Sequence, residues 1–245
     1  MMEARVRVAA ARILAGVLIV GLGQLALLGS AGADTPKGAY VGVQGGMAWT
    51  YYNNYSGCVY YCYPTYNYYN AVTYDLGYSA GVQVGYAFGG PRVEFEYNYR
   101  YNSANTTSTA DGTQPASGSL KANSYLLNFI YDFDTGSKWV PYLGLGLGAS
   151  NVQASTIHSS VPVSSGSYLD GGSTEFAGQF IAGVEFLASQ HVGVFLDWRG
   201  LWVHSANMNY GTGCPGGGTT GCAVTGTTSY YYYNGALNVG VKITF

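Results

Sequence analysis

Apolar and polar side chains alternate along most of the chain after residue 38. A period of two is typical of β-strands, because successive side chains of a strand point to opposite faces. The clearest case is RVEFEYNYRY (92–101), where Val, Phe and Tyr oppose Arg, Glu and Asn. The pattern predicts eight strands. They are expected at 39–49, 74–88, 92–101, 123–133, 139–150, 174–187, 191–204 and 230–245.

The connections between these segments alternate in length. Short turns are expected at 89–91, 134–138 and 188–190, and long loops at roughly 50–73, 102–122, 151–173 and 205–229. This asymmetry is typical of outer-membrane barrels, and each strand is long enough for a tilted crossing of about 9–11 residues. We therefore predict an all-β fold, a transmembrane up-and-down antiparallel β-barrel of 8 strands with four long extracellular loops and short periplasmic turns.

The polar face of several strands is rich in glycine. Small residues between long ones indicate a narrow interior that side chains fill. The segment 123–133 alternates less cleanly, because the same alternation turns Leu126 and Ile130 inward.

Composition agrees with this fold. Only 9% of the residues are charged, whereas about 25% is usual for soluble domains. The chain contains 37 Gly and 25 Tyr, and no stretch after residue 33 is apolar for long enough to form a transmembrane helix. The formal net charge is −2, and it becomes more negative without the first 33 residues, so a nucleic-acid partner is not expected.

Residues 1–33 have the pattern of a cleavable signal peptide. Arg5, Arg7 and Arg12 precede an apolar run, and Ala31-Gly32-Ala33 is a small-residue cleavage site, so the mature barrel domain is expected to span 34–245. The alternative is an uncleaved membrane anchor, although the apolar run is short for one and contains Gln24. The pattern favours export through the Sec pathway.

Four cysteines form two local sets, Cys58 with Cys62 and Cys214 with Cys222. An even number in an exported protein favours disulfides, although the sequence leaves three connectivities open. A zinc site is disfavoured because no histidine lies near either set. Neither a metal nor an organic cofactor is expected.

Several motifs together resemble the eight-stranded outer-membrane barrels of OmpA and Opa type, a family of porin-like proteins and surface antigens. They are YVGVQGG near the start, AGVQVGYAF before RVEFEY, PYLGLGLG, FAGQFIAGVEF and the terminal LNVGVKITF. The resemblance covers 34–245 and implies a location in the Gram-negative outer membrane, in contact with membrane lipid and lipopolysaccharide. The terminal alternation with Val241, Ile243 and Phe245 resembles the signal that the barrel assembly machinery reads in that family. We expect a monomer.

Nine charged residues occupy expected inward positions. They are Asp75, Arg92, Glu94, Glu96, Arg100, Glu185, Asp197, Arg199 and Lys242. Buried charges need partners, so the favoured interpretation is a salt-bridge network that plugs the barrel. The alternative is a narrow, porin-like passive channel.

Tyrosines form two groups. Those at the outer strand ends, such as Tyr97 and Tyr231, are expected in an aromatic girdle at the membrane interface. The second group crowds the first loop and is a candidate surface for binding a host or environmental ligand, because tyrosine gives rigid contact area. These residues are Tyr52, Tyr55, Tyr60, Tyr61, Tyr63, Tyr66, Tyr68 and Tyr69. The alternative is a loop that only covers the barrel.

Enzymatic function is not expected. His158-Ser159-Ser160 loosely resembles the His-x-Ser element of lipid A deacylases, but it lies in a Ser-rich loop without a placed carboxylate. The sequence therefore favours a structural or surface-interaction protein, with adhesion or membrane integrity as its role. A narrow channel is second and a lipid-modifying enzyme third.

Overall fold

The computed structural model describes residues 35–50, 53–57, 68–109, 112–159, 167–212 and 224–245, and every regular element among them is a strand. The strands are β1 (Lys37–Thr50), β2 (Asn53–Gly57), β3 (Tyr68–Tyr74), β4 (Gly77–Phe88), β5 (Pro91–Thr109), β6 (Gly112–Asp132), β7 (Trp139–Ser159), β8 (Ser167–Leu187), β9 (Val192–Thr212) and β10 (Val224–Thr244). In this part of the chain, no helix is long and apolar enough to cross a membrane.

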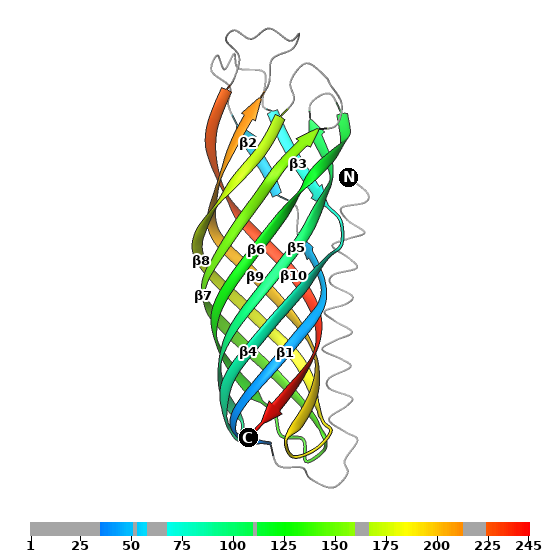
Figure 1. Cartoon of the computed structure of the whole chain (residues 1–245), viewed down its shortest axis with the longest axis vertical. Helices are drawn as coiled ribbons and strands as arrows, with labels where there is room; N and C mark the ends of the chain where they lie inside the picture. Colours follow the sequence, from blue (N-terminus) through cyan, green and yellow to red (C-terminus); the bar gives the residue numbers. More distant parts are fainter. Residues whose placement is uncertain (1–34, 51–52, 58–67, 110–111, 160–166, 213–223) are drawn as a thin grey trace.

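Eight of these strands close into an antiparallel ring (Figure 1). Neighbours pair in chain order from β4 to β10, and β1 closes the ring by pairing with both β4 and β10. The predicted fold is confirmed. The short turns are confirmed too, since β4 ends at Phe88 and β5 begins at Pro91. Gly89 (φ 84°) and Gly90 (φ 145°) take positive φ values in that turn, where a side chain would be strained.

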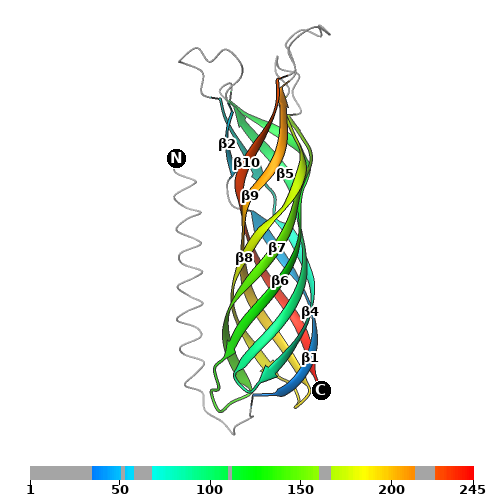
Figure 2. The same cartoon turned by 90° about the vertical axis from the view of Figure 1, so that its left-hand side faces the viewer.

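The long connections differ from the prediction, because strands occupy much of them. β6 begins at Gly112 and β7 continues to Ser159, whereas the expected limits were 123 and 150. Within the first expected loop, β2 pairs with β3, and β3 pairs with β5. The barrel therefore continues well beyond the expected strand ends, on the side opposite the C-terminus (Figure 2).

The outer face of the lower barrel is a belt of exposed apolar side chains between two groups of aromatic rings. Leu145, in the middle of the belt, is 63% exposed. The lower ring pairs are Tyr86–Phe88, Tyr131–Phe133 and Trp139–Phe186. The upper ring pairs are Tyr78–Tyr101, Tyr97–Tyr125 and Phe176–Trp202. A belt between two aromatic girdles is the lipid-facing surface of a transmembrane barrel.

Above the upper girdle, the two faces of the wall exchange character. Along β6, the outward face changes from Tyr125 to the polar Asn123 and Lys121. Its inward face changes from the polar Asn128 to the apolar Leu120. Apolar-inside and polar-outside is the pattern of a barrel in water, so the girdle marks the outer limit of the lipid-facing part.

We call the region above the upper girdle the projecting part and the region below it the membrane part. The projecting part comprises β2, β3, 102–109 of β5, 112–124 of β6, 149–159 of β7, 167–175 of β8, 203–212 of β9 and 224–230 of β10. An apolar cluster fills its interior and extends to the girdle. The cluster consists of Val72, Ala104, Leu120, Ala122, Leu126, Val152, Ala154, Ala177, Leu201, Val203, Ala206 and Tyr232.

Candidate functional site

The interior of the membrane part holds nine buried ionisable side chains, five acidic and four basic. They are Arg92, Glu94, Glu96, Arg100, Asp132, Glu185, Asp197, Arg199 and Lys242, and each is at most 4% exposed. Eight of them had been predicted to face inward. Two differences from the prediction concern Asp75 and Asp132.

The prediction for Asp75 is wrong. This residue is exposed between β3 and β4, where its carboxylate accepts a hydrogen bond from Asn105 and its backbone N–H donates to the carbonyl oxygen of Ser103 at 2.9 Å. The sequence pattern treated 74–88 as one continuous strand, which would turn residue 75 inward. The break between β3 and β4 interrupts that alternation and leaves the side chain outside.

Asp132 is the inward charge that the sequence analysis missed. It lies at the end of β6, and its Oδ1 is 3.1 Å from the NH2 group of Arg92. The alternation that turns Leu126 and Ile130 inward also turns residue 132 inward, and both of those side chains are buried. The alternation therefore places Asp132 inward. It was overlooked because the two faces of this segment differ little in polarity, since Leu126 and Ile130 are apolar but face inward.

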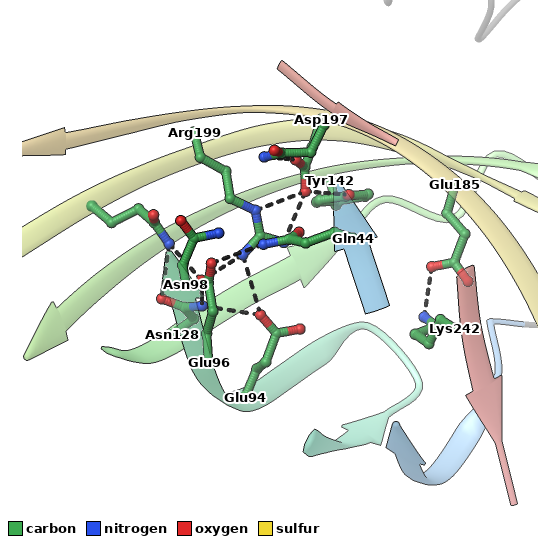
Figure 3. A network of polar contacts seen from close by, with 12 residues as sticks. Gln44, Glu94, Glu96, Asn98, Asn128, Tyr142, Glu185, Asp197, Arg199 and Lys242 are labelled. Atoms are coloured by element: carbon green, nitrogen blue, oxygen red, sulfur yellow. Dashed lines mark hydrogen bonds and ion pairs between the residues drawn. The ribbon is translucent and has the colours of Figure 1, made fainter. Parts of the chain in front are cut away.

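Arg199 is the centre of the network (Figure 3). Its Nε and NH2 groups donate to Asp197 Oδ2 at 3.0 and 2.8 Å, and its NH1 group donates to Glu96 Oε2. The same NH1 nitrogen is 3.6 Å from Glu94 Oε1. One guanidinium from β9 therefore joins carboxylates of β5 and β9 across the barrel, an arrangement that suits the planar donor fork of arginine.

Neutral amides complete the coordination of Glu96. Gln44 donates to its Oε1 at 2.9 Å, while Asn128 and Gln179 each donate to its Oε2 at 2.7 Å. Both oxygens of this buried carboxylate therefore accept hydrogen bonds from neutral donors. The network is therefore a fixed set of ion pairs in which amides from β1, β6 and β8 hold the charged groups in place.

A second group lies nearer the periplasmic end. Lys242 Nζ is 2.6 Å from Glu185 Oε2, and Arg92 NH1 is 3.7 Å from the same oxygen. Arg92 also pairs with Asp132, so two cations and two carboxylates balance in charge. This group occupies the lower interior.

Two buried tyrosines connect the groups. The Tyr40 hydroxyl donates to Glu94 Oε2 at 3.0 Å, and the Tyr142 hydroxyl donates to Asp197 Oδ2 at 3.1 Å. The Arg92 guanidinium carbon lies 4.8 Å from the centre of the Tyr142 ring, a cation–π distance. Gly183 makes room for this ring, since a Cβ at that position would lie 2.6 Å from the Tyr142 ring carbon Cζ.

Arg100 forms the upper limit of the charged interior. Its guanidinium donates to Gln179 Oε1 at 3.0 Å and to Asn234 Oδ1 at 3.1 Å, and no described carboxylate lies within ion-pair distance of it. Gln179 connects it to Glu96. Beyond Arg100 most buried side chains belong to the apolar cluster, so the lower interior is mainly charged and the upper interior mainly apolar.

The sequence matches the family model of the outer membrane protein beta-barrel domain over residues 13–245. The chain belongs to this family. Membership agrees with the closed ring of strands, and it places the protein in the outer membrane.

Solved outer-membrane barrels have the same fold. Neisserial surface protein A is 18% identical, with coverage of 86% of this chain and 100% of that chain and a TM-score of 0.50. The outer membrane protein OprG from Pseudomonas aeruginosa is 14% identical, with coverage of 87% and 99% and a TM-score of 0.53. The outer membrane protease OmpT from Escherichia coli is 8% identical over 87% and 98%, but its TM-score of 0.49 is too low to carry an argument. No curated protein sequence matches significantly.

The predicted outward residues of the last strand lie on the lipid-facing surface of this family member. Val241, Ile243 and Phe245 are exposed, and the backbone N–H of Phe245 donates to Ala39 at 2.9 Å. This placement keeps the terminal strand in the closed ring next to β1. Its reading by the assembly machinery stays a prediction.

Several predicted outer sites fall partly or wholly outside the described residues. All four cysteines and the signal peptide lie outside them, as do Tyr52, Tyr60, Tyr61, Tyr63 and Tyr66. Tyr55 lies on β2, and Tyr68 and Tyr69 lie on β3, so these three belong to strands of the projecting part. Within the described ranges, no group of three or more His, Cys, Asp or Glu residues could hold a metal ion.

Proposed function

We propose that this protein acts by contact through its outer end, as a sealed barrel that carries a surface-interaction region away from the membrane. The observation that supports this proposal is the filling of the interior at successive levels. Ion pairs close the membrane part, and apolar side chains close the projecting part. With its interior filled, the barrel would act mainly through its outward faces and loops.

The projecting part favours contact over transport for a second reason. Its ordered strands extend β6, β7, β8 and β9 to 21 residues each, about twice the length of one crossing. This extension raises the outer strand ends above the lipid headgroups, where a partner on another surface is within reach. A polar outer wall suits that environment.

A narrow passive channel is the alternative, and it predicts measurable conductance. An ion would have to break the pairing of Arg199 with three carboxylates and then pass the apolar cluster, where an unpaired charge is costly. We therefore expect the purified protein to give no steady openings in a planar bilayer, under conditions in which a large porin conducts. Steady openings of nanosiemens size, abolished by removal of the protein, would overturn the sealed-barrel proposal.

The contact role is tested at the loop tips. Residues 58–67 can be replaced by a short Gly/Ser linker, leaving β2 and β3 intact. We expect cells that display this variant to lose attachment to glycan- or protein-coated surfaces, because the replaced segment holds four of the eight candidate tyrosines. Replacing residues 213–223 in the same way is the matched control for shortening a tip. Unchanged attachment of both variants, at equal amounts of folded protein, would contradict the proposal.

A further inference from the structure

A polar patch on the outer wall of β6 and β7 borders the upper girdle. Ladder pairing arranges the residues of this wall in rows across β5–β8. The girdle row is Tyr97, Tyr125, Ala149 and Phe176; the next row is Tyr99, Asn123, Asn151 and Thr174; and the row above begins Tyr101, Lys121 and Gln153. We call Lys121, Asn123, Asn151 and Gln153 the amide–lysine patch.

Lys121 is the one lysine or arginine on the outside of the projecting part. The Lys and Arg residues from 35 to 245 are Lys37, Arg92, Arg100, Lys121, Lys138, Arg199 and Lys242. Four of them are buried in the interior, and Lys37 and Lys138 lie at the opposite end of the barrel. None of the ion pairs among the described residues includes Lys121. Its charge is therefore not neutralised by any of the ion pairs that the described residues form.

Hydrogen bonds hold the neighbouring amides in place. Asn151 Nδ2 donates to Thr174 Oγ1 at 2.9 Å, and the Tyr97 hydroxyl donates to Asn123 Oδ1 at 2.9 Å. Each amide has further donor and acceptor capacity beyond its one bond. Fixed amides beside a cation match a ligand that combines sugar hydroxyls with a phosphate.

The level of the patch relative to the membrane indicates which molecule carries this phosphate and these sugar hydroxyls. Tyrosine and tryptophan of a girdle lie at the level of the lipid headgroups. Lys121 pairs with the girdle residue Tyr101, and Asn123 lies one row above the Tyr97–Tyr125 pair, so the patch is at the level of the headgroups of the outer leaflet. We propose that the amide–lysine patch binds the phosphorylated sugar headgroup of an outer-leaflet glycolipid, with Lys121 on a phosphate and the amides on sugar hydroxyls. This site is independent of the loop tips.

The test is native mass spectrometry of the full mature chain in detergent, titrated with bisphosphorylated lipid A. We expect Lys121→Gln to weaken binding about tenfold, the effect of losing one charge-assisted hydrogen bond. Lys121→Arg should keep the affinity, because the charge remains. Lys138→Gln is the matched control, since it removes an exposed lysine at the opposite end and should leave binding unchanged.

Two further ligands test whether the patch recognises the phosphate of a glycolipid or free inorganic phosphate. A dephosphorylated form of the same glycolipid should bind about as weakly as lipid A binds to Lys121→Gln, and inorganic phosphate should not displace lipid A. Heat-modifiable gel mobility confirms that each variant is folded. The proposal is overturned by equal lipid A affinity of Lys121→Gln and the parent protein, by an equal loss in Lys138→Gln, or by displacement with inorganic phosphate.

Discussion

Replacing Arg199 with methionine is expected to lower the free energy of unfolding by about 3–5 kcal/mol, the usual effect of removing one partner from a buried ion-pair cluster. The guanidinium contacts Asp197, Glu96 and Glu94, all of which are nearly inaccessible to solvent. Methionine fills much of the volume but leaves these carboxylates without their shared cation. The measurement is denaturant unfolding of the barrel in lipid vesicles, followed by heat-modifiable gel mobility.

Two further variants isolate the charge effect. Lys138→Met removes an exposed lysine at a periplasmic turn and should change the stability by no more than about 0.5 kcal/mol. Adding Glu96→Gln to Arg199→Met removes one of the stranded carboxylates and should restore part of the loss. If Arg199→Met costs less than about 1 kcal/mol, water must solvate the carboxylates, and the interior is not sealed at this level.

The membrane part of the fold could be predicted from the sequence because the lipid outside the barrel and the polar interior select very different side chains. Lipid selects residues such as Leu145 and Val241 for the outer face, and the narrow interior selects charged residues, amides and glycine. This contrast makes the period of two visible in most strands, and the inward side of eight buried charges follows from it. The alternation fails where a strand breaks, as at Asp75.

The pairing of these charges could not be predicted. Alternation gives the face of a residue but neither its height in the barrel nor its partner across it. Arg199 and Glu96 are 103 positions apart and meet because β5 and β9 lie on opposite sides of a narrow ring. Arg100 has the same inward alternation, yet it contacts amides instead of a carboxylate.

The projecting part was interpreted as loops because its two faces contrast weakly. Several of its inward side chains are small, as with Ala122 and Ala154, and many of its outward side chains are serine, threonine or asparagine. Alanine and serine differ little in hydropathy, so a strand with small residues inside resembles a polar connection. The reversal of faces at the girdle further reduces the signal, because one strand carries two opposite patterns.

Above the upper girdle the apolar residues of a strand face inward and its polar residues face outward. Ala154 is 3% exposed and faces the apolar cluster, whereas the next residue, Ser155, faces outward and is exposed. Ala154→Asp is expected to lower the free energy of unfolding by about 3 kcal/mol or more, because it buries a carboxylate without a partner. Ser155→Asp should change it by no more than about 0.5 kcal/mol.

Amide hydrogen exchange of residues 112–124 and 149–159 distinguishes a local from a global response. We expect Ala154→Asp to increase exchange throughout the projecting part while the membrane part keeps its protection, because the ion-pair network supports the latter independently. Equal exchange of Ala154→Asp and Ser155→Asp would mean that the two faces of β7 are equivalent there and that residues 151–159 behave as a solvated loop. A rigid, water-excluding column above the membrane requires the difference, and the proposed surface role depends on that column.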